Sequence, residues 1–200
     1  MNKDEYIAEV EKSMRKIYNY SEPVVVNHLN DYVLDKRSKS ALKDLLIDKY
    51  FNGKAAIFGK GLPEKKQKNF QYVFVSIYED NEYAYIAVVG KSSFWNKKLE
   101  NGVVDSRESN CLGDLFKPYT KKSKTVECVL KNTKCNTLDD INAKIITAVI
   151  LPIDVHNYQT KRLKGKHKTK PDLKAENYEN KIRDDLLSKI KGKGLILNIK

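Results

Sequence analysis

The sequence predicts an α+β fold, with an N-terminal helical layer followed by a mainly antiparallel, twisted sheet and a C-terminal amphipathic helix. Helical periodicity dominates residues 1–53, β-branched and aromatic residues dominate 69–153, and helical periodicity returns after residue 172. Hydrophobic residues make up 40% and charged residues 32% of 200 residues. These values predict one folded domain that spans 1–200.

The helical layer begins with an amphipathic helix predicted over 4–18, which ends before Pro23. Its apolar face contains Tyr6, Val10, Met14 and Ile17. A second helical stretch is expected over 27–34. A third is expected to begin near Ser38, which can cap the first turn, and to close near Gly53. Residues 54–68 hold glycines, a proline and several lysines, so we expect a loop there.

The sheet is predicted to begin with a strand over 69–78 that is buried on both faces, because it is apolar or aromatic without alternation. Polar residues at 79–82 form the expected turn to a second strand over 83–89. The pair Asn101-Gly102 favours a type I′ turn and indicates a second hairpin between 94–99 and 103–104. Further strands are expected over 125–130 and over 145–153, the latter stopping at Pro152, with a short helix over 138–142.

The C-terminal part is predicted to follow a basic loop over 154–171. Pro171 and Asp172 are favourable first residues of a helix, and Gly192 is a favourable C-terminal cap. Its apolar residues are Tyr178, Ile182, Leu186 and Ile190. Residues 195–199 are short and apolar, so the segment 172–200 is expected to hold this helix and an edge strand.

A dense basic tract carries half of the formal net charge of +12. It contains Lys161, Arg162, Lys164, Lys166, Lys168 and Lys170. No carboxylate lies between Val155 and Pro171. Such density favours a polyanion, RNA or DNA, as partner, and six phosphate contacts would give a logarithmic salt slope of roughly −5.

Aromatic residues interleave with these and other cations. Trp95 precedes Lys97 and Lys98, and Tyr158 precedes the basic tract. Aromatic faces stack on unpaired bases while lysines follow the phosphates, which is how single strands are commonly held. Core or rim positions explain Trp95 and Tyr158 equally well.

Two of the three histidines, His156 and His167, lie beside or within the tract. A histidine can transfer protons near neutral pH while cations stabilise the developing charge on a phosphate. Lys91, Arg162 and Lys164 are candidates for that stabilising role, which would permit RNA cleavage by its own 2′-hydroxyl. A solvated histidine in a lysine run is the simpler alternative.

No metal or cofactor is expected. The cysteines at 111, 128 and 135 lack a metal-ligand spacing and fit free thiols in a reducing compartment. Gly90-Lys91-Ser92 lacks the glycine that a phosphate-binding loop needs at position 85. Glu127 and Lys131 lack the usual spacing of metal-dependent nucleases, and Asp139, Asp140, Glu79 and Asp80 fit capping or turn positions.

Residues 74–77 and 85–95, with Ile150-Leu151-Pro152-Ile153, resemble the ToxN and AbiQ endoribonucleases of type III toxin–antitoxin systems. In that family a strand pair leads into a loop with hydroxyl and lysine side chains, and a later strand ends in an apolar-proline-apolar step. The resemblance implies a highly twisted sheet, metal-independent RNA cleavage and an inhibitory RNA as partner. It also implies that Lys91, Ser92 and Ser93 belong to the active loop.

Three functional hypotheses follow. The leading one is a nucleic-acid-binding protein acting as an endoribonuclease of toxin or phage-defence type. The second is a non-catalytic phage or mobile-element protein that docks on nucleic acid or on a host nucleic-acid-binding protein. The third is a metal-dependent DNA nuclease, which requires carboxylates to converge in space. The most informative observation would be whether Lys91 and His156 share a cleft with carboxylates. The carboxylates in question are Glu79, Asp105 and Glu127.

The location is predicted to be the cytoplasm, without membrane association. Apolar runs are far shorter than the roughly 20 residues of a membrane span. Asp4 and Glu5 stand where a signal peptide needs cations followed by an apolar stretch.

Overall fold

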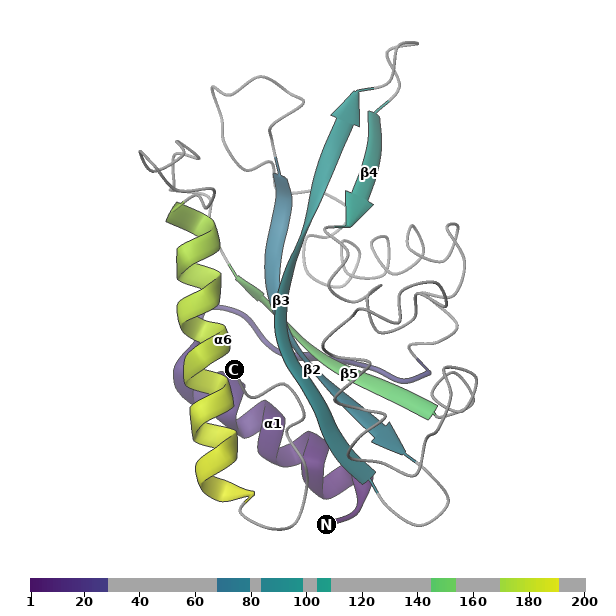
Figure 1. Ribbon diagram of the computed structural model, residues 1–200, viewed down its shortest axis with the longest axis vertical. Coiled ribbons are helices and arrows are strands. Elements are labelled where there is room, and N and C mark those ends of the chain that lie inside the picture. The colour runs from purple at the N-terminus through teal and green to yellow at the C-terminus, as the bar shows by residue number, and fades with distance from the viewer. Residues whose placement is uncertain (29–67, 80–83, 99–103, 109–144, 154–169, 191–200) are drawn as a thin grey trace, which may run out of the picture.

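A computed structural model describes residues 1–28, 68–79, 84–98, 104–108, 145–153 and 170–190. These residues form helix α1 (Lys3–Ile17), strands β1 (Val24–Val26), β2 (Lys68–Glu79), β3 (Ala84–Lys98), β4 (Val104–Glu108) and β5 (Ile145–Ile153), and helix α6 (Lys170–Lys189). Two helices and an antiparallel sheet confirm the predicted α+β class (Figure 1).

Helix α1 confirms the first predicted helix and begins with a capping box. The Asn2 side chain accepts a hydrogen bond from the Glu5 backbone, and the Glu5 carboxylate accepts one from the Asn2 backbone. Each bond satisfies an amide that the helix itself leaves unpaired. The predicted apolar positions Tyr6, Val10 and Met14 are buried.

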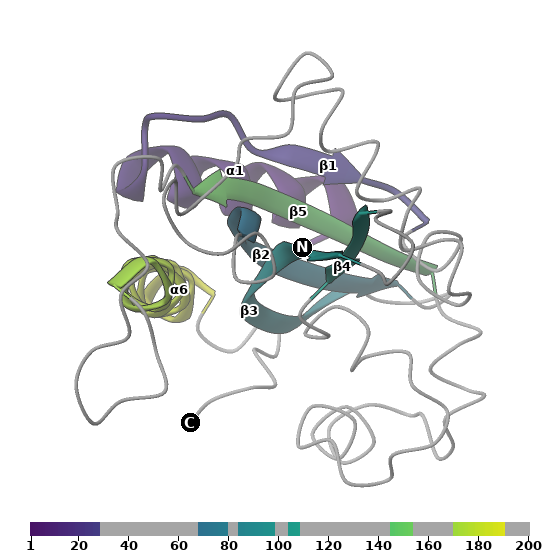
Figure 2. The same cartoon turned by 90° about the horizontal axis from the view of Figure 1, so that it is seen from above.

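Strand β2 is the centre of the sheet, whose strand order is β1-β5-β2-β3-β4. It pairs antiparallel with β3 on one side and with β5 on the other, as seen from above in Figure 2. All residues from Gln71 to Tyr78 are buried, on both faces of the sheet. The prediction of a strand buried on both sides is therefore confirmed, as is the hairpin with β3.

Strand β3 is longer than predicted and continues from Ala84 to Lys98 without interruption. Its last residues pair with β4, with Lys98 opposite Val104, which confirms the second hairpin. Lys91, Ser92 and Ser93 therefore lie within a strand, where the family resemblance implies a loop. The register of β2 with β3 shifts between Ser76 and Ile77, a β-bulge that increases the local twist.

Strand β5 has the predicted bounds, but the expectation that it stops at Pro152 is wrong, because Pro152 lies within the strand opposite Tyr72 of β2. Proline lacks the amide that a sheet requires, so it is tolerated only where that amide would face away from a partner strand. The β1 ladder ends at Ile150, and the Pro152 carbonyl accepts a hydrogen bond from the Ser21 hydroxyl at 2.5 Å. The Ser21 side chain therefore supplies a hydrogen bond to β5 beyond the last residue that pairs with β1.

Strand β1 was not predicted, so the assignment of residues 1–53 to a helical layer is wrong at Val24–Val26. These three valines pair antiparallel with residues 148–150 of β5 at an edge of the described sheet. Three β-branched residues are too few for a periodicity signal. These residues form a strand because they pair with β5, which lies more than a hundred residues later in the chain.

Helix α6 confirms the predicted C-terminal helix and begins two residues earlier, at Lys170, with Pro171 in its first turn. Ile182, Leu186 and Ile190 are buried, and Tyr178 packs against the core.

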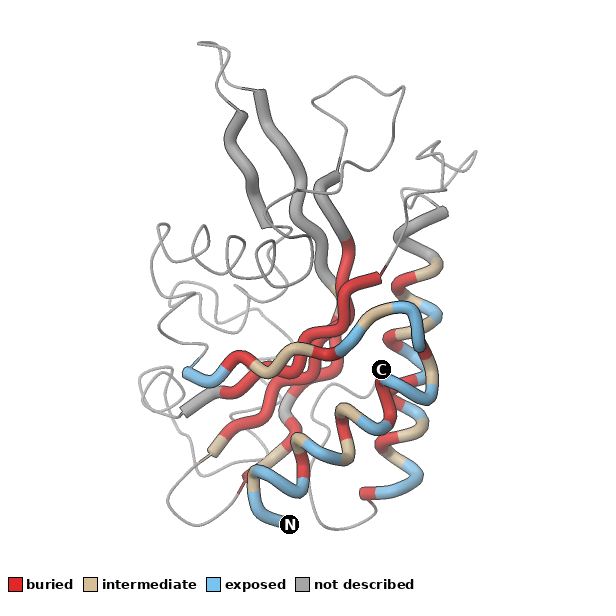
Figure 3. The backbone as a smooth tube through the Cα atoms, turned by 180° about the vertical axis from the view of Figure 1, so that it is seen from behind, coloured by how far each residue is buried: buried red, intermediate tan, exposed pale blue. Residues whose placement is uncertain are grey.

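Helices α1 and α6 lie side by side against one face of the sheet (Figure 3). Tyr18, at the end of α1, makes edge-on ring contacts with Tyr178 of α6 at 5.0 Å and with the exposed Tyr20 at 5.4 Å. The two helices and the sheet share one apolar cluster.

Several predictions lie outside the described residues. The helix predicted over 27–34 does not begin where expected, because Asn27 and His28 are not helical, and its remainder lies outside the described residues. Also outside them are the helix over 38–53, most of the loop at 54–68, the turns at 80–83 and 99–103, the strand over 125–130, the short helix over 138–142, the basic loop up to 169 and the edge strand over 195–199.

The Gly90 position tests the packing of β2 against β3. A Cβ atom on Gly90 would lie 2.7 Å from Cζ and 2.9 Å from Cε1 of the buried Phe74 ring. Alanine would reduce the entropy of the unfolded chain, which favours folding by only about 0.4–1 kcal/mol. We therefore expect Gly90→Ala to lower the free energy of unfolding by about 1–3 kcal/mol, measured by urea denaturation.

Combining Gly90→Ala with Phe74→Leu is the control. The smaller side chain leaves room for the new methyl group, so the double variant should lose less stability than the sum of the two single losses. Additive losses, or a Gly90→Ala variant as stable as the parent, would contradict this account.

Candidate nucleic-acid interface

The predicted site residues divide into two groups. Lys91, Ser92, Trp95, Lys97 and Lys98 all belong to β3. Lys170 is the first residue of α6. The remaining candidates lie outside the described residues: His156, His167, Tyr158, Lys161, Arg162, Lys164, Lys166 and Lys168. Apart from Lys170, the described part of the candidate interface is therefore a strand.

The end of β3 forms a two-stranded extension of the sheet, here called the β3–β4 ribbon and made of residues 91–98 with β4. The pairing of β2 with β3 ends at the pair Lys68–Trp95, so residues 96–98 pair with β4 alone. Figure 1 shows the ribbon rising past the ends of both helices. The fold thus presents part of this strand away from the helical layer.

The register adds two cations that sequence reasoning missed. Lys68 of β2 lies opposite Trp95, and Arg107 of β4 lies opposite Trp95 from the other side. Sequence assigned Lys68 to a loop, and Arg107 stands alone in its segment. Only the pairing of three strands reveals that both are neighbours of the tryptophan.

Lys97 and Lys98 have different partners across the ribbon. Lys97 lies opposite Asp105, and Lys98 lies opposite Val104. Opposite charges at directly facing positions stabilise paired strands by about 0.2–1 kcal/mol. We therefore expect Lys97 to support the ribbon itself, in addition to any contact with a ligand.

Of the carboxylates considered for a metal site, Glu79 and Asp105 do not converge on Lys91, and Glu127 lies outside the described residues. The β2 partner of Lys91 is Val73, six positions from Glu79, and Asp105 pairs six positions from Lys91 in the other direction. Six strand residues span about 20 Å. Glu79 is instead bound to Lys3 at 3.0 Å. Within the described segments, no three His, Cys, Asp or Glu residues are grouped so that they could hold a metal ion.

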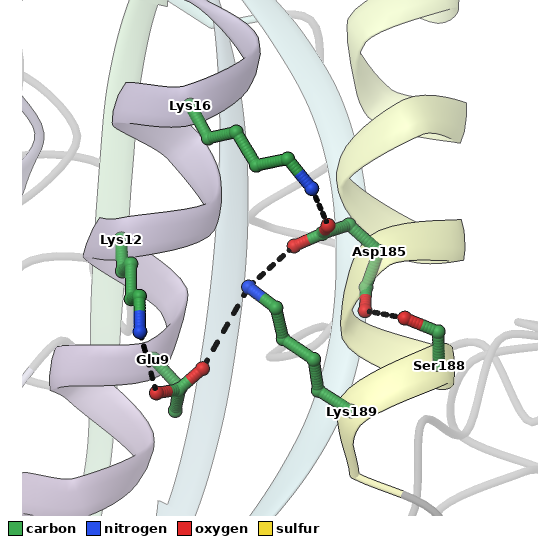
Figure 4. Close-up of polar contacts among 6 residues, drawn as sticks. All are labelled: Glu9, Lys12, Lys16, Asp185, Ser188 and Lys189. Atoms are coloured by element: carbon green, nitrogen blue, oxygen red, sulfur yellow. Dashed lines mark hydrogen bonds and ion pairs between the residues drawn. The ribbon is translucent and has the colours of Figure 1, made fainter.

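A separate charge cluster joins the two helices (Figure 4). The Asp185 carboxylate of α6 binds Lys16 of α1 at 2.8 Å and Lys189 at 2.7 Å. Lys189 also reaches Glu9 of α1 at 3.7 Å. Glu9 in turn lies 3.9 Å from Lys12. The cluster crosses the α1–α6 contact, so its role is to hold the helices together.

The environment of Asp185 favours its charged form. Burial alone would raise the pKa of this carboxyl. Hydrogen bonds from Lys16 and Lys189, followed by one from Ser13, outweigh burial and hold the pKa well below its usual range. A carboxylate that stays ionised at neutral pH between two lysines is suited to structure and not to proton transfer.

A second ion pair is contained within α6. Arg183 binds Glu179 at 2.6 Å and donates to the Asn180 side chain at 2.8 Å, and both charged side chains are buried. Because a carboxylate already neutralises it, Arg183 is not a candidate for binding phosphate.

Comparisons with known proteins give no match: no family model fits the chain, and neither a curated protein nor a solved structure is significantly similar to it. In the described part of the chain, no helix is long and apolar enough to cross a membrane.

The cluster predicts a specific effect of Asp185→Asn. The change removes the charge that Lys16 and Lys189 share, so we expect a loss of about 1–3 kcal/mol in the free energy of unfolding at pH 7. The pKa of Asp185 is lower in the folded protein than in the unfolded chain, where it is about 3.9. The stabilisation from its charge is therefore complete when the pH is well above 3.9 and declines as the pH falls below that value. Urea denaturation at pH 7 and pH 3 should show a smaller pH effect in the variant than in the parent.

Asp184→Asn is the matched control, because Asp184 is the neighbouring residue and is exposed. It should change stability at pH 7 by less than about 0.5 kcal/mol. Equal effects of the two substitutions would show that the helix contact does not depend on the cluster.

Proposed function

We propose that the protein binds nucleic acid, in the first place RNA, through the β3–β4 ribbon together with the basic tract at 161–170. The observation that carries the proposal is the placement of Trp95 between Lys68 and Arg107, on a ribbon that also contains Lys91 and Lys98. Aromatic residues among cations are the usual means of holding unpaired nucleic acid.

The distribution of charge supports the same function. Among the described residues in and beside the ribbon are five cations and two carboxylates, Asp105 and Glu108, so positive charge is in excess there. The cations are Lys68, Lys91, Lys97, Lys98 and Arg107. Lysines of the helices such as Lys16 and Lys189 are already paired with carboxylates. Phosphate binding is therefore expected at the ribbon and the tract, and not on the α1–α6 contact.

RNA cleavage is part of the proposal. In it, Lys91 stabilises the phosphate together with Arg162 and Lys164, while His156 or His167 transfers protons; Ser92 is an additional candidate by resemblance. Metal ions have no role in this scheme. A non-catalytic protein that docks on nucleic acid, or on a host protein that binds it, is the alternative, and an inhibitory RNA is an expected partner of the cleaving form.

The basic tract predicts salt-dependent binding. In filter-binding titrations, the affinity for RNA or DNA should fall steeply with salt, with a logarithmic slope of roughly −5. The triple variant Lys164→Ala/Lys166→Ala/Lys168→Ala should reduce the magnitude of that slope by about 2 to 3, because three phosphate contacts are removed. Negligible binding of the parent protein would instead favour a protein partner.

The double variant Lys12→Ala/Lys181→Ala is the control for nonspecific charge. Both lysines are exposed on the helices. Because they lie outside the proposed surface, the slope should stay close to that of the parent.

Cleavage has its own test. Purified protein incubated with labelled RNA in EDTA should produce ends with a 2′,3′-cyclic phosphate. His156→Ala should abolish the products if His156 transfers the proton, and His167→Ala serves as the comparison. If no metal condition yields cleavage while RNA is still bound, the protein is a binder and not a nuclease.

A further inference from the structure

The three residues Lys68, Trp95 and Arg107 form one row across strands β2, β3 and β4. Neighbouring strands are about 4.8 Å apart, so the row spans about 10 Å of backbone with the indole residue at its centre. A tryptophan with one cation on each side differs from a general basic surface, because it defines where a base and where the phosphates can bind.

The row exists because of a β-bulge in β2. The register changes between Lys68 and Phe70, since Phe70 lies opposite Phe94 whereas Lys68 lies opposite Trp95. In an unbroken ladder, Asn69 would stand opposite Trp95. The extra residue therefore brings Lys68 into the tryptophan's row, which is the kind of repositioning that bulges achieve.

The cations are distributed unequally between the two faces of the ribbon. Residues at alternate positions of a strand share one face, so Lys91 and Lys97 share the face of Trp95. The other set of positions contains one cation, Lys98. Four of the five cations in and beside the ribbon, counting Lys68 of β2, thus belong to the set that includes the tryptophan and its row.

We propose that this row binds a single-stranded segment of nucleic acid, with one unpaired base stacked on Trp95 and the neighbouring phosphates bound by Lys68 and Arg107. Bases in a duplex are already stacked on one another, so only a single strand offers a free aromatic face. The inference rests on the proposed nucleic-acid binding and adds its substrate class and its recognition row.

The chain contains a single tryptophan, so its fluorescence reports on this row alone. Titration of the complete protein with oligo-uridine RNA or oligo-thymidine DNA should quench Trp95 emission, because the base stacks on the indole. A blunt-ended duplex of matched length, which has no unpaired loop, should bind with little quenching. Comparing the RNA and DNA arms identifies which single strand is preferred.

Variants test the same row through the anisotropy of a labelled oligonucleotide. Trp95→Ala should weaken single-strand binding about 5- to 150-fold and duplex binding by less than about 2-fold, and Trp95→Phe should retain part of the affinity. Lys68→Ala and Arg107→Ala should each reduce the magnitude of the salt slope by about 0.7. Lys12→Ala, at an exposed position of α1 outside the proposed surface, is the control and should leave single-strand affinity within about 2-fold.

The outcomes separate the two proposals. If oligonucleotides bind without quenching, and Trp95→Phe, Lys68→Ala and Arg107→Ala bind as the parent does, the row is not the site although nucleic-acid binding stands. If the parent protein binds neither single strands nor duplexes at low salt, the proposed function itself is overturned. Quenching is measured on the parent protein, so it remains decisive even if Trp95→Ala fails to fold.

Discussion

Strand β2 is the element on which the rest of the described structure depends. It lies third of five strands, with β5 and β3 as antiparallel neighbours, and its residues from Gln71 to Tyr78 are buried on both faces. A strand in this position has partners for its backbone groups on both sides and contributes side chains to both faces. Its close packing is visible where the Phe74 ring covers Gly90 of β3, leaving no room for a larger residue there.

The candidate interface follows from a difference in strand length. Strand β3 continues after its pairing with β2 ends at Lys68, and β4 provides the partner that keeps residues 96–98 in the sheet. The same continuation brings Trp95 between residues of two other strands. A core strand therefore passes directly into the proposed binding ribbon, and its pairing with β2 and β4 positions the row that we propose to hold a base.

Positive charge has two separate uses in this molecule. Lys16 and Lys189 neutralise Asp185 at the contact of the two helices, where charge serves stability. The ribbon cations instead outnumber the neighbouring carboxylates. A net charge of +12 thus indicates a polyanion only in part, and the distinction requires knowledge of which cations already have partners.

The sequence by itself determined the α+β class, the α1 and α6 helices and both hairpins, because helical spacing, β-branched runs and an Asn-Gly turn are local signals. It also indicated Trp95 with its following lysines. Only the tertiary structure decided that Val24–Val26 is a strand, and that Lys68 and Arg107 flank Trp95. It also separated Glu79 from Lys91. The physical reason is that strand partners and β-bulges depend on residues far apart in the chain, which no local pattern encodes.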